Sequence, residues 1–197
     1  MKKLSLNARL VTSLFFLGFV NSVGGQVLLN KYETKGHPKA KGLSIAVRYP
    51  QNWEAREGER PNIVQRFEGE FGGTSGLLIL QINAMDGNVE NECKGMTAKD
   101  WRETFEVPGI SIVNPRTIHH ENQPGAILEI SQSTERAGTL MHGYSRVMAI
   151  CYKSKLVIAW CGSSEPTSTT KVKNNMSLLS PLCSQYFNSM VFLDKYK

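Results

Sequence analysis

The sequence predicts an α+β fold, in which a central antiparallel β-sheet of about six to seven strands has helices packed on both faces (an α/β/α sandwich). Seven segments have the composition and period of strands and are separated by turn-forming residues. Two of them, residues 147–151 and 156–161, are apolar at every position, which is typical of a hairpin covered on both faces. Two amphipathic helices are available to cover it.

The strands follow from alternation and from turn residues. Residues 43–49 alternate between apolar and polar side chains and stop at Pro50, as a half-buried strand does. The other six expected strands are residues 63–67, 77–85, 111–118, 126–131, 144–152 and 156–161. The glycine-rich residues 69–76 form the turn between the second and third strands.

The two helices have recognisable ends. The first, residues 97–106, begins at Thr97 as N-cap, with Asp100 placed to bond back to the cap. The second begins at Ser180 as N-cap with Pro181 at the first helical position, where a missing N–H costs nothing. Residues 170–179 are a further helical candidate ahead of it.

The first 25 residues predict a secretory signal peptide. A basic start is followed by the apolar residues 10–20 and then by small residues up to Gly25, which places cleavage before Gln26. With no cysteine near that point, we do not expect a lipoprotein, and no other run is long enough to cross a membrane. The sequence therefore predicts a periplasmic or secreted protein whose mature form has no transmembrane segment.

Positive charge is concentrated at the N-terminal end. The whole chain has a net charge of +6, but residues 43–197, the expected single domain, contain 16 basic and 16 acidic residues. We therefore expect no nucleic-acid partner. Residues 26–42 form an expected basic, flexible tail, which is either an arm for an acidic partner or an anionic lipid surface, or a solvated linker. Its candidate partner-binding residues are Lys31, Lys35, Lys39 and Lys41.

Cysteine count and spacing predict two disulfides. The four cysteines are Cys93, Cys151, Cys161 and Cys183, an even number in an oxidising compartment. A turn at residues 154–155 sets Cys151 opposite Ile158, so Cys151 and Cys161 point to opposite faces of the sheet. Each is then expected to bridge to the helix on its own face. We favour Cys161 with Cys183, because the chain runs from that strand straight to the last helix, and this leaves Cys93 with Cys151. Four buried thiols are the alternative.

No catalytic or metal motif is complete. Ser168 and Lys171 match Ser-x-x-Lys without its companion motif. On a strand, the neighbouring His119 and His120 point to opposite faces, and His119 with Glu121 supplies only two ligands where a metal site needs three or four. We expect no cofactor, no metal and no enzymatic activity.

The order of these elements resembles the PsbP-like group, which includes the extrinsic photosystem II subunit, bacterial DcrB-type envelope proteins and a eukaryotic Ran-binding import factor. The resemblance covers about residues 43–192. It is carried by Tyr49, Pro50 and Trp53 after the first strand, by the helix closing at residues 108–109, and by the turn at residues 123–126 ahead of the hairpin and final helix. It implies a protein that binds or assembles other proteins rather than a catalyst.

The leading functional hypothesis is an exported, non-enzymatic protein that binds a protein partner and helps to assemble an envelope complex. Two alternatives remain open. One is a periplasmic immunity or inhibitor protein that neutralises a toxin, and the other is a hydrolase whose site the sequence does not reveal.

Overall fold

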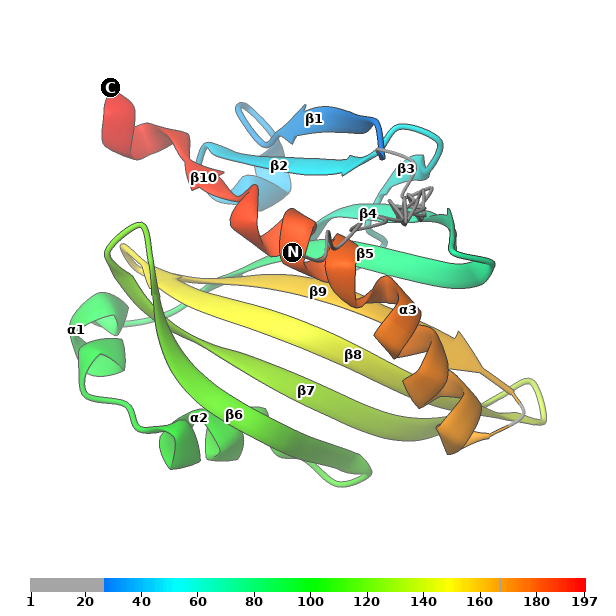
Figure 1. Ribbon diagram of the computed structural model, residues 1–197. Coiled ribbons are helices and arrows are strands. Elements are labelled where there is room, and N and C mark those ends of the chain that lie inside the picture. Colours follow the sequence, from blue (N-terminus) through cyan, green and yellow to red (C-terminus); the bar gives the residue numbers. More distant parts are fainter. Residues whose placement is uncertain (1–26, 167) are drawn as a thin grey trace, which may run out of the picture.

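A computed structural model describes residues 27–166 and 168–197, so the expected signal peptide and its cleavage point lie outside the described residues. Two sheets are present (Figure 1): a large antiparallel sheet of order β3-β4-β5-β9-β8-β7-β6 and a small sheet of order β1-β2-β10. The large sheet contains β3 (Glu54–Glu57), β4 (Ile63–Phe71), β5 (Thr74–Ala84), β6 (Ile110–His120), β7 (Gln123–Arg136), β8 (Thr139–Tyr152) and β9 (Lys155–Glu165). The small sheet contains β1 (Leu29–Glu33), β2 (Ile45–Pro50) and β10 (Val191–Phe192).

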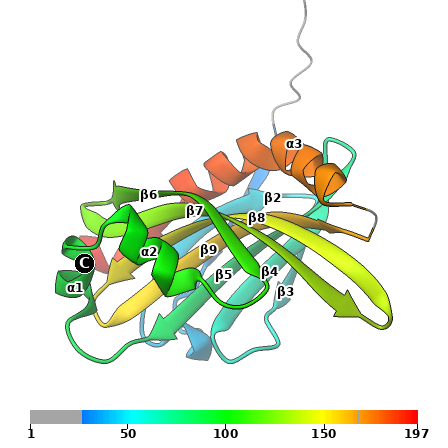
Figure 2. The ribbon, with the colours of Figure 1, turned by 90° about the horizontal axis from the view of Figure 1, so that it is seen from below.

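The helices lie on both faces of the large sheet, as expected. The α-helices are α1 (Val89–Lys94), α2 (Ala98–Phe105) and α3 (Thr169–Asn188), and the 3₁₀ helices are η1 (Pro38–Ala40) and η2 (Leu193–Tyr196). Helix α3 and the small sheet cover one face (Figure 1), whereas α1 and α2 cover the other (Figure 2). The predicted α+β class is confirmed. The expected strands correspond to β2 and β4–β9, but β2 lies in the small sheet rather than in the central one. The exposed edge strand β3 and the short strands β1 and β10 were not predicted.

Each face of the large sheet has its own hydrophobic core. Along β8, Met148 and Ile150 face α3, while Val147 and Ala149 face α1 and α2. Strand side chains alternate in direction, so an apolar residue at every position is what a strand between two cores requires. The uninterrupted apolar sequence of the β8–β9 hairpin therefore has the predicted cause.

The expectation of a flexible tail over residues 26–42 is wrong for most of this segment. Residues 29–33 form strand β1, which pairs with β2 from Leu29 opposite Pro50 to Glu33 opposite Ala46. Thr34 is fully buried, and its hydroxyl donates to the carbonyl oxygen of Leu43. Strand β1 forms because it pairs with β2, which lies outside residues 26–42. No periodicity within the segment itself therefore indicated a strand.

The predicted start of the last helix at Ser180 is also wrong. Helix α3 begins after Ser168, whose hydroxyl accepts from the backbone N–H of Lys171, and it continues through Pro181 to Asn188. Its buried face starts well before Pro181, with Val172 and Leu179 both fully buried. Burial of apolar side chains on both sides of the proline stabilises one continuous helix, although proline disfavours a helix interior.

Helix α2 has the predicted N-terminus. Thr97 is the N-cap, its hydroxyl accepts from the backbone N–H of Asp100, and the Asp100 carboxylate accepts from the backbone N–H of Thr97. This capping box fixes where the helix starts. It brings Trp101, almost fully buried, onto the sheet.

Both predicted disulfide pairings are present. Cys93 is bonded to Cys151, and Cys161 is bonded to Cys183. The hairpin turn lies at residues 153–154, one residue before its expected place, so Cys151 is opposite Leu156 rather than Ile158 and the pairing is shifted by two residues. A shift of two residues preserves which face each side chain occupies, so Cys151 and Cys161 point to opposite faces of the sheet, as predicted.

Candidate functional site

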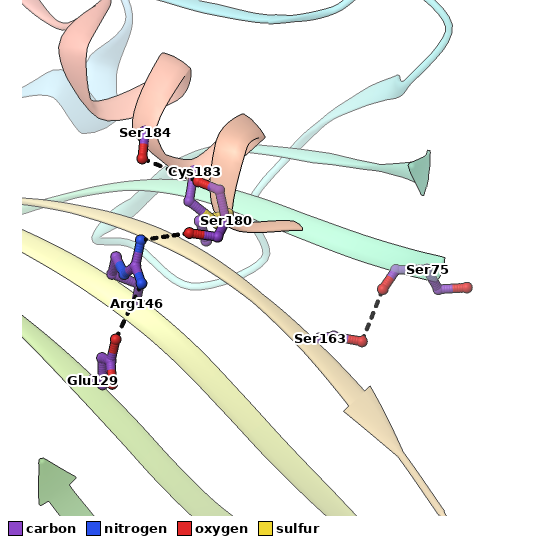
Figure 3. The surroundings of a disulfide bond; sticks show 8 residues. Ser75, Glu129, Arg146, Ser163, Ser180, Cys183 and Ser184 are labelled. Carbon is purple, nitrogen blue, oxygen red and sulfur yellow. Dashed lines mark hydrogen bonds and ion pairs between the residues drawn. A yellow bond between two sulfur atoms is a disulfide. The ribbon is translucent and has the colours of Figure 1, made fainter. Parts of the chain in front are cut away.

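A hollow of about 380 Å³ lies between strands β7 and β8 and helix α3. We call it the charged hollow, and its lining residues are Glu129, Tyr144, Arg146, Lys173, Met176, Ser177 and Ser180. It lies on the α3 face of the large sheet, where Figure 1 shows β7 emerging from beneath the helix. Figure 3 shows three of its lining residues, Glu129, Arg146 and Ser180, in the surroundings of Cys183.

Sheet register and helix period bring these residues together. Glu129 on β7 is directly opposite Arg146 on β8, and Tyr144 is two residues before Arg146, on the same face. On α3, Lys173, Ser177 and Ser180 are spaced as neighbours along one side of a helix. Because serine is small, this side of α3 leaves open the space that larger side chains would fill.

Glu129 and Arg146 form the floor of the hollow. Arg146 Nη2 donates to Glu129 Oε1 at 3.1 Å, and Arg146 Nη1 donates to Ser180 Oγ at 3.0 Å (Figure 3). The Tyr144 hydroxyl donates to Glu129 Oε2 at 2.9 Å, and Asn114 Nδ2 donates to the same oxygen at 3.0 Å. Four elements, β6, β7, β8 and α3, are therefore connected by one hydrogen-bonded network.

The network determines the ionisation of its members. Burial alone would raise the pKa of Glu129, but hydrogen bonds from Tyr144, Asn114 and Arg146, together with the charge of Arg146, lower this pKa below its ordinary value. Burial and the neighbouring carboxylate raise the pKa of Tyr144 to about 12. At neutral pH, Glu129 is therefore an anion and Tyr144 a neutral hydrogen-bond donor.

One cation of the hollow remains uncompensated. Arg146 and Glu129 neutralise each other, while Lys173 forms no ion pair within residues 27–166 and 168–197. The Lys173 ammonium lies 6.0 Å from the centre of the Tyr144 ring, at the outer limit of a cation–π contact, and Lys173 lines the hollow. The site thus presents a fixed hydrogen-bonding floor and a net positive charge.

The four candidate lysines are placed on the N-terminal segment but do not form one site. Lys31 pairs with Glu33 at 2.5 Å, and Lys39 pairs with Glu57 at 2.8 Å and also donates to the carbonyl oxygen of Gly58. Lys35 and Lys41 are exposed. Two of the four charges are thus compensated locally, and the charged hollow is elsewhere in the fold.

The motifs rejected as metal or catalytic sites have structural roles. His120 Nε2 lies 2.8 Å from the carbonyl oxygen of Met190, and Glu121 accepts from the backbone N–H of Phe192 at 3.0 Å. These contacts attach the β6–β7 turn to the chain around β10. Among the described residues, no group of three or more potential metal ligands occurs. No helix in this part of the chain has the length and apolarity needed to span a bilayer.

Sequence reasoning did not find the charged hollow. A signal was nevertheless present, because Glu129 and Arg146 are charged residues inside the predicted strands 126–131 and 144–152, which are otherwise largely apolar. A charged residue in such a strand indicates a buried partner or a site. The pairing itself required the β7–β8 register and the position of α3.

The fold and its cross-links define a class: a disulfide-bonded α+β protein with a PsbP-like fold. The structure is similar to the solution structure of cyanobacterial PsbP (CyanoP) from Synechocystis sp. PCC 6803, with a TM-score of 0.51, 12% sequence identity, and coverage of 89% of this chain and 98% of that chain. It is also similar to the Ran-binding protein Mog1p of Saccharomyces cerevisiae, with a TM-score of 0.52, 10% identity, and coverage of 87% and 98%.

Comparison of the sequence itself adds nothing further. No protein-family model matches this chain, and no curated protein matches it. At such low identity the structural similarity establishes a shared fold, while function has to be argued from the site.

Proposed function

We propose that this protein is exported and acts outside the cytoplasm as a non-enzymatic module that binds a protein partner and helps to assemble an envelope complex. The charged hollow is the observation that supports binding of a protein partner. Two disulfides support the location, because such bonds persist in oxidising compartments and are rare in the cytoplasm.

The chemistry of the hollow favours binding over catalysis. Glu129 accepts from three different side chains, and its lowered pKa keeps it ionised at neutral pH. The raised pKa of Tyr144 keeps it protonated. A general acid or base works best with a pKa near the operating pH, whereas these groups are held in one protonation state. Fixed donors and charges of this kind are suited to recognising a partner.

The fold comparison gives secondary support for protein binding. Mog1p is by its name a Ran-binding protein, so a domain of this fold can serve as a protein-binding surface. Because identity is only 10%, the partner of that protein says nothing about the partner of this one.

Site-specific photo-cross-linking tests the proposal. A photoreactive phenylalanine replaces Ser177, which is exposed at the rim of the hollow, and in a matched variant it replaces Lys99, which is exposed on α2 on the opposite face. In the native envelope we expect one dominant protein adduct from position 177 and none from position 99. Adducts from neither position would contradict the binding proposal.

Intact-mass analysis tests export separately. Protein recovered from the envelope fraction should begin near Gln26, weigh less than the 22.0 kDa chain and contain no free thiol. Retention of Met1, or recovery in the cytoplasmic fraction with four free thiols, would contradict export.

One contact supports a second candidate function, a serine hydrolase. Ser133 Oγ lies 2.9 Å from His142 Nδ1, and both residues are on neighbouring positions of β7 and β8 near the start of α3. A hydroxyl within hydrogen-bond reach of an imidazole is the core of a nucleophile–base pair. Turnover of a p-nitrophenyl ester that disappears in Ser133→Ala would favour this function; equal rates in the two proteins would exclude it for this pair.

A further inference from the structure

We propose that the charged hollow binds an acidic, extended segment of the partner protein, with a carboxylate next to Lys173 and a backbone N–H donating to the carbonyl oxygen of Ser177. This inference rests on the proposed protein-binding function. It adds the chemistry of the ligand, which neither the fold nor the comparisons specify.

The charges around the hollow favour an anionic ligand. Lys173 stands above the floor on α3, and Arg116 lies across the sheet on β6, opposite Ile127, which packs against the α3-side core. In the described part of the chain, neither Lys173 nor Arg116 forms an ion pair, and Glu129 is already neutralised by Arg146. An approaching carboxylate therefore meets one uncompensated cation in the hollow, Lys173, and a second, Arg116, lies on the neighbouring strand β6.

Pro181 leaves one backbone carbonyl group of α3 without its usual helical hydrogen-bond donor. In an α-helix, the carbonyl oxygen of Ser177 would accept from the backbone N–H of residue 181. Residue 181 is proline, which has no N–H, so this bond cannot form inside α3. The Ser177 carbonyl therefore lacks its helical donor, and because Ser177 lines the hollow, we infer that an extended chain lying there donates to it.

The shape of the site favours a peptide over a lipid surface. The charged hollow is a recess beside a helix, and its floor groups are partly buried, with side chains 24% exposed at Arg146 and 19% exposed at Glu129. A flat membrane surface would contact the rim alone. An extended chain can lie along α3, where Ser177 and Ser180 leave room for it.

Defined peptides test the ligand chemistry. The probe is a fluorescein-labelled decapeptide of alternating Glu and Val, compared with peptides in which Gln or Lys replaces Glu, and binding to the mature protein is measured by fluorescence polarisation. We expect the Glu peptide to bind most tightly, the Lys peptide least, and the preference to weaken as salt is added. Equal binding of the Glu and Gln peptides overturns the inference.

Two variants test the two contacts. Lys173→Gln should weaken binding of the Glu peptide by about two- to fivefold, while the matched neutralisation Lys99→Gln on α2 should not change it. Pro181→Ala restores an N–H that donates to Ser177, so it should weaken binding of all three peptides alike while the circular dichroism and Tm show a folded protein. Unchanged binding in both variants overturns the proposed contacts.

Vesicle binding and cross-linking distinguish a failure of this inference from a failure of the proposed protein-binding function. Binding to phosphatidylglycerol vesicles that Lys173→Gln abolishes, without any preference among the peptides, would assign the hollow to a lipid surface and overturn the inference. A protein adduct from position 177 combined with charge-independent peptide binding would leave the proposed function standing and remove the acidic-segment inference alone.

Discussion

Cys151 and Cys161 lie on the two strands of one hairpin, yet their side chains enter different hydrophobic cores. Cys151 belongs to the core beneath α1 and α2, and Cys161 to the core beneath α3. Each bonds to a cysteine on the elements that cover its own face. The central hairpin is thus covalently attached to the layer on each side.

The first prediction concerns this connectivity. Non-reducing peptide mapping of the exported protein should yield the peptide pairs Cys93–Cys151 and Cys161–Cys183, with no alkylation before reduction. Reduction should then release four alkylatable thiols. A Cys151–Cys161 peptide would contradict the opposite placement of these two side chains on the sheet.

The second prediction concerns stability. Loop closure in the unfolded chain suggests that removing Cys161–Cys183, with a sequence separation of 22, costs about 3 kcal/mol, and that removing Cys93–Cys151, with a separation of 58, costs about 4 kcal/mol. Paired Cys→Ala variants and urea denaturation measure both values. The reduced wild-type protein provides the control, since its loss should approach that of the combined variants.

The third prediction concerns the pH dependence of the charged hollow. The fold lowers the pKa of Glu129, so its carboxylate stabilises the fold above the unfolded pKa of about 4.3, and this contribution disappears as the pH falls through the folded pKa. Glu129→Gln should reduce the free energy of unfolding at pH 7 by about 1–2 kcal/mol. The difference from wild type should vanish at acidic pH.

A matched carboxylate tests whether this effect belongs to the network. Glu103 is exposed on α2 and pairs with the exposed Lys99 at 3.7 Å, so Glu103→Gln should change the unfolding free energy little at any pH. An equal pH dependence in the two variants would show that the network around Glu129 makes no specific contribution.

The fourth prediction distinguishes the N-terminal lysines. Lys39→Gln removes the contacts with Glu57 and the Gly58 carbonyl, and should lower Tm by about 1–3 °C. Lys35→Gln, at an exposed position, should leave Tm unchanged. If the segment were a mobile linker, the two variants would behave alike.

Much of the fold could be predicted because its causes are local or periodic. Alternation in residues 43–49 and the apolar hairpin follow from the two-residue period of a strand, and the Thr97 cap from the unsatisfied N–H groups at a helix start. The exclusion of a Cys151–Cys161 bond also followed, since the parity of a strand decides on which face each cysteine lies, and the order of strand and helix along the chain favoured Cys161–Cys183. These outcomes needed no knowledge of distant contacts.

Only the tertiary structure decided the rest. Strand β1 exists because β2 supplies its hydrogen-bond partners, and α3 continues through Pro181 because the sheet buries apolar side chains on both sides of the proline. The charged hollow requires Glu129 and Arg146 in register and Lys173 above them on α3. A sequence pattern records the period of each element, but the contacts between elements depend on how they pack, and the site is built from those contacts.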